Sequence, residues 1–227
     1  MTWPTTREEM IAAQEALAAA SPPLWRPPQG EVVFGGCYAC FGRGASGPGQ
    51  KDDPGWAAAV LMAGSKVIGT ATVDGRAGAA YEAGLLGMRE GPLLEAAVRA
   101  LRRLPDLLIV NATGRDHPRR AGLALQLGSV LDVPTVGVTH RTLLAQGDWP
   151  EDRPGAVSPL LVDEELVGYR LRTQKDARPL VVHPGWRTDA AQAAEVVLAA
   201  CRTARTPEPL RRAREAARLA RQEATRR

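Results

Sequence analysis

The stretch from Asp106 to Ala124 constrains the fold of this chain more than any other. It opens with four aliphatic residues, Leu107 to Val110, which have the length and composition of a strand buried on both faces. A polar loop follows, and Pro118 with the arginines after it predicts a helix that begins near Arg119. Side chains that leave the carboxyl end of such a strand project into the crevice where α/β sheets bind ligands. The polar candidates for a site there are Asn111, Thr113, Asp116, His117, Arg119 and Arg120.

Strand and helix patterns alternate around this stretch. An antiparallel meander is predicted first, with strands over residues 31–41, 56–63 and 66–73 and a glycine-rich loop over 42–54. Later strands are predicted over residues 135–138, 160–162, 166–171 and 179–182. Helices are predicted over residues 7–20, 90–104, 119–131 and 188–203, and a last one after Pro209. This order of elements predicts an α/β, ribonuclease-H-like fold, a mixed sheet flanked by helices.

Length, charge and cysteine content set further limits. We expect one domain over residues 1–206 and an arginine-rich helix or tail over 207–227. The formal net charge is only +4, and we interpret the arginines after Thr206 as a solvated helical face rather than a phosphate-binding site. The chain has no apolar run of roughly 18 residues and no basic and apolar signal at its start. We therefore expect no membrane span. Because the three cysteines cannot all pair, we also expect a reducing, cytoplasmic setting.

Motifs on both sides of the central strand resemble those of the endonuclease V family. The central motif is Gly114 with His117-Pro-Arg-Arg120, followed by Gly122 and by Val-Pro-Thr-Val-Gly-Val at 133–138. Other matching segments are Tyr81–Pro92, Pro154–Ala156, Leu171–Thr173, Arg178–Leu180 and Pro184–Arg187. Together they cover most of residues 8–212. The resemblance implies the fold of a metal-dependent nuclease that cuts DNA or RNA near inosine, a deaminated purine.

In that family, acidic residues from three elements hold a divalent ion such as Mg²⁺, which prefers carboxylate oxygens and activates water. Carried over one at a time, Glu90 keeps the acid of the helix that follows the substrate loop. The acid of the first strand is Tyr38 here, and the acid of the central strand is Asn111. An amide oxygen is neutral, and a phenol with a pKa of about 10 is a poor ligand at neutral pH. The resemblance therefore implies a degraded metal site, and we expect no metal cofactor.

Further departures fall on positions that act on nucleic acid in the family. The basic residue after the Gly-Val strand aligns with His140 or Arg141, and the histidine after the central acid is Thr113. The histidine of the Pro-Gly-His-Arg motif is Trp186. The Pro-Tyr-Ile-Pro-like wedge that separates DNA strands is Ala80-Tyr-Glu-Ala83, which places a carboxylate beside phosphate. Because the substitutions gather on the metal, the water and the wedge, we interpret the chain as a nuclease fold that has lost its nuclease function.

The remaining polar residues predict a rebuilt pocket. The expected catalytic residues are His117, Asp116, Glu90, Asn111 and Tyr38. The expected substrate-binding residues are Arg119, Arg120, Arg187, Trp186, His140, Cys37 and Thr113. The arginines would form a cationic cradle for a leaving oxyanion, and a base of the first set would accept a proton from an attacking amine. We hypothesise metal-independent chemistry on a small anionic substrate in secondary metabolism, such as aziridine ring closure with loss of sulfate, with a partner subunit.

Two other functions stay open from the sequence. The first is an active nuclease that uses Mg²⁺ or Mn²⁺ to cut inosine-containing nucleic acid. It requires replacement ligands from Asp116, Glu82, Asp52 or Asp53. The second is a non-catalytic subunit that stabilises or regulates a partner, for which the polar residues of the crevice need not act on a substrate.

Overall fold

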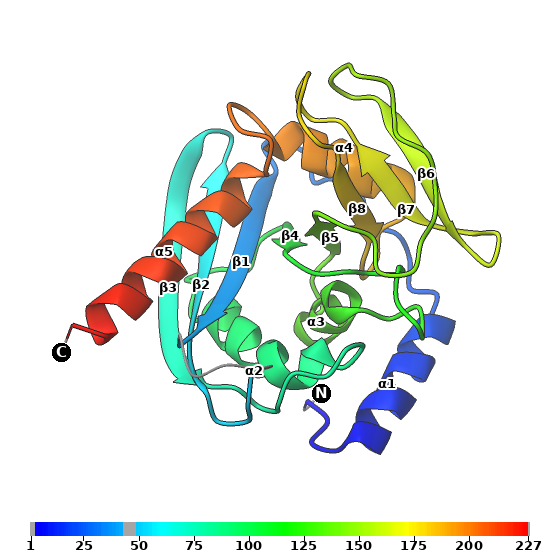
Figure 1. Ribbon diagram of the computed structural model, residues 1–227. Coiled ribbons are helices and arrows are strands. Elements are labelled where there is room, and N and C mark those ends of the chain that lie inside the picture. Colours follow the sequence, from blue (N-terminus) through cyan, green and yellow to red (C-terminus); the bar gives the residue numbers. More distant parts are fainter. Residues whose placement is uncertain (1–2, 43–48, 227) are drawn as a thin grey trace.

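The computed structural model describes residues 3–42 and 49–226, and residues 43–48 of the predicted glycine-rich loop lie outside the described residues. Eight strands form one mixed sheet in the order β3-β2-β1-β4-β5-β8-β7-β6, with helices on both faces (Figure 1). The strands are β1 (Val33–Phe41), β2 (Pro54–Ala63), β3 (Lys66–Arg76), β4 (Leu107–Val110), β5 (Thr135–Thr139), β6 (Val157–Val162), β7 (Glu165–Leu171) and β8 (Leu180–Pro184). The helices are α1 (Arg7–Ala19), α2 (Leu86–Arg99), α3 (Leu123–Leu131), α4 (Ala190–Ala200) and α5 (Glu208–Ala224). The predicted mixed sheet flanked by helices is confirmed.

The centre of the sheet is parallel and brings three strand ends together. β4 pairs in parallel with β1 on one side and with β5 on the other. Val110 of β4 lies opposite Cys37 of β1 and Gly137 of β5. The residues that follow Cys37 and Val110, which are Tyr38 and Asn111, therefore lie side by side at the carboxyl edge of the sheet. This is the edge where α/β folds place ligand sites.

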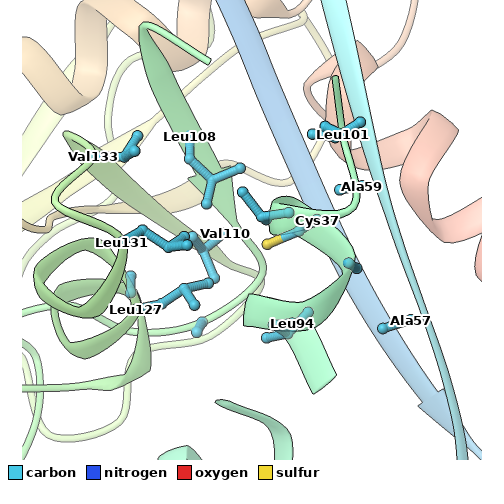
Figure 2. Packing of buried hydrophobic residues seen from close by; sticks show 14 of the residues in the cluster. Cys37, Ala57, Ala59, Leu94, Leu101, Leu108, Val110, Leu127, Leu131 and Val133 are labelled. Atoms are coloured by element: carbon cyan, nitrogen blue, oxygen red, sulfur yellow. The ribbon is translucent and has the colours of Figure 1, made fainter. Parts of the chain in front are cut away.

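Aliphatic side chains on the two faces of the sheet form two separate cores. Because β4 is buried on both faces, its residues alternate: Leu108 and Val110 point toward α2 and α3, and Leu107 and Ile109 point toward α4. Figure 2 shows the first of these cores, in which Cys37 lies among leucines and valines from β4, α2 and α3. The first core holds α2 and α3 on one face of the sheet, and the second holds α4 on the other.

The last helix, α5, lies along β1 and β2 on the face opposite to α2 (Figure 1). Gly36 permits this close approach, since a Cβ at that position would lie 2.3 Å from the backbone carbon of Pro209. Ala217 is fully buried against the sheet. Further along, Arg221 donates a hydrogen bond to the carbonyl of Phe41 at 3.1 Å. The helix therefore follows β1 as far as the carboxyl end of that strand.

Two helix starts differ from the sequence prediction. α3 begins at Leu123 rather than near Arg119, because Arg120 has a left-handed backbone with φ of 51° that an α-helix does not accept. Pro118 consequently lies in a turn and not in the first turn of the helix. α2 begins at Leu86, ahead of the predicted start at residue 90. No helix in the described part of the chain combines the length and apolarity that crossing a bilayer requires.

Candidate functional site

Two adjoining cavities lie at the carboxyl edge of the parallel strands. The large cavity has a volume of about 200 Å³ and is lined by Tyr81, Glu82, Ala83, Gly84, Leu86, Asn111, Ala112, Thr113, His117, Leu123, Gln126, Thr139 and Leu143. The small cavity has a volume of about 140 Å³ and is lined by Cys37, Tyr38, Ala39, Leu86, Glu90, Leu94 and Asn111. Leu86 and Asn111 belong to both linings. The two cavities are therefore parts of one crevice.

Glu90 supplies the one carboxylate in the lining of the small cavity. Burial raises the pKa of Glu90 to about 7, although the positive charge of Arg89 acts to lower it. Arg89 is itself buried and is held by other groups: it pairs with Asp53 at 2.7 Å and donates to the carbonyls of Gln50 and Ala79. At neutral pH, Glu90 is therefore a mixture of carboxylic acid and carboxylate.

The neighbours of Glu90 on β1 face opposite sides of the sheet. Cys37 lies in the core below α2, where burial and the charge of Glu90 raise the pKa of its thiol, so the thiol is protonated. The ring of Tyr38 packs against α5, next to Ala217. The guanidinium of Arg214 lies 5.8 Å from the centre of that ring. Of the predicted catalytic residues, Glu90, Asn111 and Tyr38 therefore meet at this cavity, with Tyr38 directed to the α5 side.

The donors in the crevice do not fit a divalent ion of the kind that the resemblance implies. Mg²⁺ takes about six oxygen ligands, with one or two carboxylates among the protein ligands and near-ideal octahedral geometry. The three positions carry one carboxylate that is partly protonated, Glu90, together with the neutral groups of Asn111 and Tyr38. Among residues 3–42 and 49–226, no group of three histidine, cysteine, aspartate or glutamate side chains could hold a metal ion. The donor set of this crevice therefore lacks the charge that a tightly bound divalent ion requires.

Asp116, one of the possible replacement ligands, is already engaged by the chain itself. Its carboxylate is fully buried and accepts hydrogen bonds from the backbone N–H groups of Leu143 at 2.7 Å, Leu144 at 2.8 Å and Ala145 at 2.9 Å. Both oxygens are thus used by the loop after β5. Because Leu143 lines the large cavity, Asp116 fixes one wall of the crevice. The structure gives it this positioning part in place of the predicted catalytic one.

The carbonyl of Gly84 collects three donors from distant parts of the chain. Gln14 Nε2, His117 Nε2 and Arg119 Nη2 each lie 3.0 Å from this oxygen. Arg119 also donates to Gln14 Oε1 at 2.5 Å, and its backbone N–H donates to His117 Nδ1 at 3.2 Å. Burial lowers the pKa of His117 to about 4, and the positive charge of Arg119 adds to this. His117 is therefore a neutral ring with both nitrogens bonded, which holds the loop over the large cavity instead of acting as a free base.

The three arginines of the predicted cationic cradle do not converge. Arg119 is bound to the carbonyl of Gly84. Arg120 pairs with Glu165 of β7 at 3.0 Å. Arg187 and Trp186 line a separate hollow of about 390 Å³ between α1 and α4. The cradle for a small oxyanion is not assembled, so ring closure with loss of sulfate loses its physical basis in this crevice.

The other predicted residues divide between the crevice and its surroundings. Thr113 and His117 line the large cavity together with Asn111. His140 belongs to neither lining: its Nδ1 accepts a hydrogen bond from Arg205 at 3.0 Å. Burial lowers the pKa of His140, and the nearby guanidinium groups lower it further. The crevice thus gathers the predicted residues in β1 and after β4, and leaves out those predicted after β5 and β8.

Gln126 lines the large cavity from α3 and is absent from the residues predicted by sequence. It is 4% exposed, and its Nε2 donates to the carbonyl of Ala121 at 2.7 Å. Its side-chain oxygen Oε1 has no hydrogen-bond partner among the described residues. A buried acceptor that stays unpaired costs about 1–3 kcal/mol, which a donor on a ligand would relieve. The sequence gives little indication of this role, because a single glutamine within Leu-Ala-Leu-Gln-Leu is equally typical of a core residue whose amide is fully hydrogen-bonded.

The raised pKa of Glu90 makes stability depend on pH. Because the folded-state pKa of about 7 exceeds the ordinary value of 4.5, the folded chain binds this proton more tightly than the unfolded chain does. Stability is therefore lost as pH rises between these values, by roughly 3 kcal/mol in total. Glu90→Gln cannot ionise, so its free energy of unfolding should exceed that of the wild type at pH 8 more than at pH 4.5. Urea unfolding at both pH values measures this, with Glu223→Gln on exposed α5 as control; parallel pH profiles for Glu90→Gln and wild type would contradict it.

Comparison with known proteins relates this geometry to a family. A family model described as Endonuclease V matches residues 42–215. A relative from Nocardia farcinica, named Endonuclease V, is 37% identical over 239 residues, which cover 99% of this chain and 97% of the relative. The crystal structure of the Endonuclease V from Streptomyces avermitilis matches with a TM-score of 0.88 and 34% identity, covering 98% of this chain and 96% of that chain. The predicted endonuclease V type of ribonuclease-H-like fold is confirmed.

A more distant match carries a nucleic acid. The crystal structure of Endonuclease V from Ciona intestinalis, in complex with a 24mer DNA containing an inosine followed by a ribo-adenosine, has a TM-score of 0.75. It is 19% identical and covers 96% of this chain and 98% of that chain. At this identity the likeness shows the shared fold alone.

Proposed function

This chain belongs to the endonuclease V family, and we propose that it binds nucleic acid that contains inosine, with the deaminated base in the large cavity. The Ciona intestinalis relative is complexed with DNA that contains an inosine. Proteins that act on a base take it out of the stack and read it by apolar contacts and hydrogen bonds in a closely fitting pocket. The large cavity, at the end of a central strand, has the size and position for such a base.

The unpaired oxygen of Gln126 is the observation that carries this proposal. Gln126 lines a cavity whose other walls include Leu86, Leu123 and Leu143, and its Oε1 lies just behind that lining, against Gly87 of α2. Hypoxanthine, the base of inosine, has an N–H donor at N1, where adenine has an acceptor. A base that presents this donor to Gln126 Oε1 would satisfy the acceptor and fill the apolar space. Gln126 is therefore the residue expected to favour inosine over adenosine.

Replacing Gln126 with leucine should reduce the preference for inosine by about tenfold, because a hydrogen bond that reads a base is worth roughly 1–3 kcal/mol of discrimination. Leucine keeps the volume and the apolar contacts of the site. Fluorescence anisotropy with single strands that differ only in inosine or adenosine measures both dissociation constants. The titrations contain a chelator, so that cleavage does not contribute.

Ser129→Ala, further along the same helix and outside the cavity lining, is the matched control and should leave the preference unchanged. Equal affinities of the wild-type chain for the two strands would refute the proposed recognition of inosine. An unchanged preference in Gln126→Leu would remove Gln126 from the proposal.

Cleavage of the bound strand is the second candidate function. The family name of the Nocardia farcinica relative favours it, as does the carboxylate of Glu90, which stays at the end of the parallel strands. The donors present argue for slow cleavage at best, because two of the three positions carry no charge. Activity with Mg²⁺ or Mn²⁺ on an inosine-containing strand that Glu90→Ala abolishes would establish this function for the unmodified chain.

A further inference from the structure

The outer face of α5 carries arginines beside the crevice. Arg214 lies over the ring of Tyr38, and Tyr38 is one of the residues that line the small cavity. Arg218 follows one helical turn later, about 6 Å along the axis. Both line a surface hollow of about 570 Å³ on α5, together with Arg211, Glu215, Leu219 and Gln222. This face therefore continues from the mouth of the crevice toward the carboxyl end of β1.

A third cation approaches the same place from the segment before α5. Arg205 donates to His140 Nδ1 at 3.0 Å and to the carbonyl of Arg178 at 2.9 Å. Arg205 and Arg214 both lie close enough to His140 for their positive charges to lower the pKa of its ring. We call Arg205, Arg214 and Arg218 the arginine track.

The arginines of the track differ from the two arginines near the start of α5 in how their charge is used. Elsewhere on α5, Arg211 and Arg212 both pair with Glu208, at 2.6 Å and 2.9 Å. The acid nearest to the track on α5, Glu215, is 3.7 Å from Arg212. Among the described residues, no carboxylate pairs with any arginine of the track. The guanidinium groups of Arg214 and Arg218 therefore remain available to an anionic partner, whereas that of Arg205 also donates to His140 and to the carbonyl of Arg178.

We infer that the arginine track binds the phosphate backbone of the nucleic acid strand whose base enters the large cavity. This inference rests on the proposed function. A guanidinium group presents a planar fork of donors that matches phosphate oxygens, and successive arginines can each contact a different phosphate. For Arg214 and Arg218, this inference is an alternative to their interpretation from sequence as part of a solvated helical face.

The test measures how affinity depends on salt. Each phosphate contact on a single strand contributes about 0.7 to the slope of log affinity against log salt. Arg214→Gln with Arg218→Gln should therefore lower the slope by about 1.4 and weaken binding of an inosine-containing single strand by roughly tenfold at low salt. Anisotropy titrations between about 50 and 200 mM KCl give both quantities. Arg214→Lys with Arg218→Lys should keep most of the slope, because the charge is retained.

A matched control removes the same net charge elsewhere. Arg103→Gln with Arg153→Gln takes away two arginines that pair with Asp106 and Glu151 on other surfaces, and should leave the slope unchanged. If both glutamine pairs shift the slope equally, the effect is one of net charge and the track is refuted. If the wild type prefers inosine but the track variant binds with the wild-type slope, the track fails while the proposed function stands. If the wild type binds no strand, the proposed function itself fails.

Discussion

A chain in which Tyr38 and Asn111 are both replaced by aspartate should cleave an inosine-containing strand in the presence of Mg²⁺ at least about a hundredfold faster than the wild type. The two positions lie side by side at the carboxyl edge, next to Glu90. Two added carboxylates would supply the oxygen ligands and the negative charge that a hard dication requires. A bound ion that stabilises the leaving oxygen by about 3 kcal/mol accounts for a factor of this size. Gel analysis of end-labelled strands measures the rate.

The controls separate metal binding from an altered surface. Adding Glu90→Ala to the double variant should return the rate to that of the wild type. Asn111→Asp alone should give a smaller gain, because only two carboxylates would then be present. If the wild-type chain already cleaved as fast as the double variant, Glu90, Asn111 and Tyr38 would be sufficient to hold the metal ion.

Asp116→Ala should cause the largest loss of stability of any single substitution around the crevice. It leaves three backbone N–H groups without an acceptor, those of Leu143, Leu144 and Ala145. Each bond to a buried carboxylate is worth about 1.5–3 kcal/mol, so a loss on the order of 4 kcal/mol is expected after partial access of water. For a chain of this length the melting temperature should fall by about 10 °C. Calorimetry measures it.

Asp163→Ala is the matched control for this effect. Asp163 accepts a hydrogen bond from the side chain of Arg120 at 2.8 Å, and its own side chain is 88% exposed. An exposed ion pair contributes at most about 1 kcal/mol, so the melting temperature should fall by no more than about 3 °C. A similar small change in Asp116→Ala would mean that the loop after β5 finds other acceptors, and would contradict the part assigned to this carboxylate.

The sequence predicts the frame of the site well because strand order and burial follow local rules. The short aliphatic run of β4 and the parallel neighbours of that strand place Asn111 and Tyr38 at one edge of the sheet. Glu90 follows from the position of α2. These residues need only the periodicity of their own element and the rule that strand ends meet at the carboxyl edge.

The charged residues could not be assigned in the same way. Arg119 looks like a phosphate ligand in sequence, yet its partners are Gln14 and the carbonyl of Gly84, which lie far away along the chain. Arg120 has a left-handed backbone, and the neighbouring residues in the sequence do not predict this conformation. Conversely, Arg214 reads as part of a solvated helix, and only the packing of α5 brings it over Tyr38. Long side chains reach partners that depend on the whole fold.

Through Gln14, which is one of the three donors to the carbonyl of Gly84, the first helix supports the loop that covers the large cavity. Gln14 lies outside the span that the family model matches, residues 42–215, and yet it is one of the supports of the loop that bears Tyr81. A chain shortened to begin after Ala20 would retain the whole sheet but would release this loop from one side. The carbonyl of Gly84 would then keep only His117 and Arg119 of its three donors, and affinity for a strand would drop although no residue facing the base had changed.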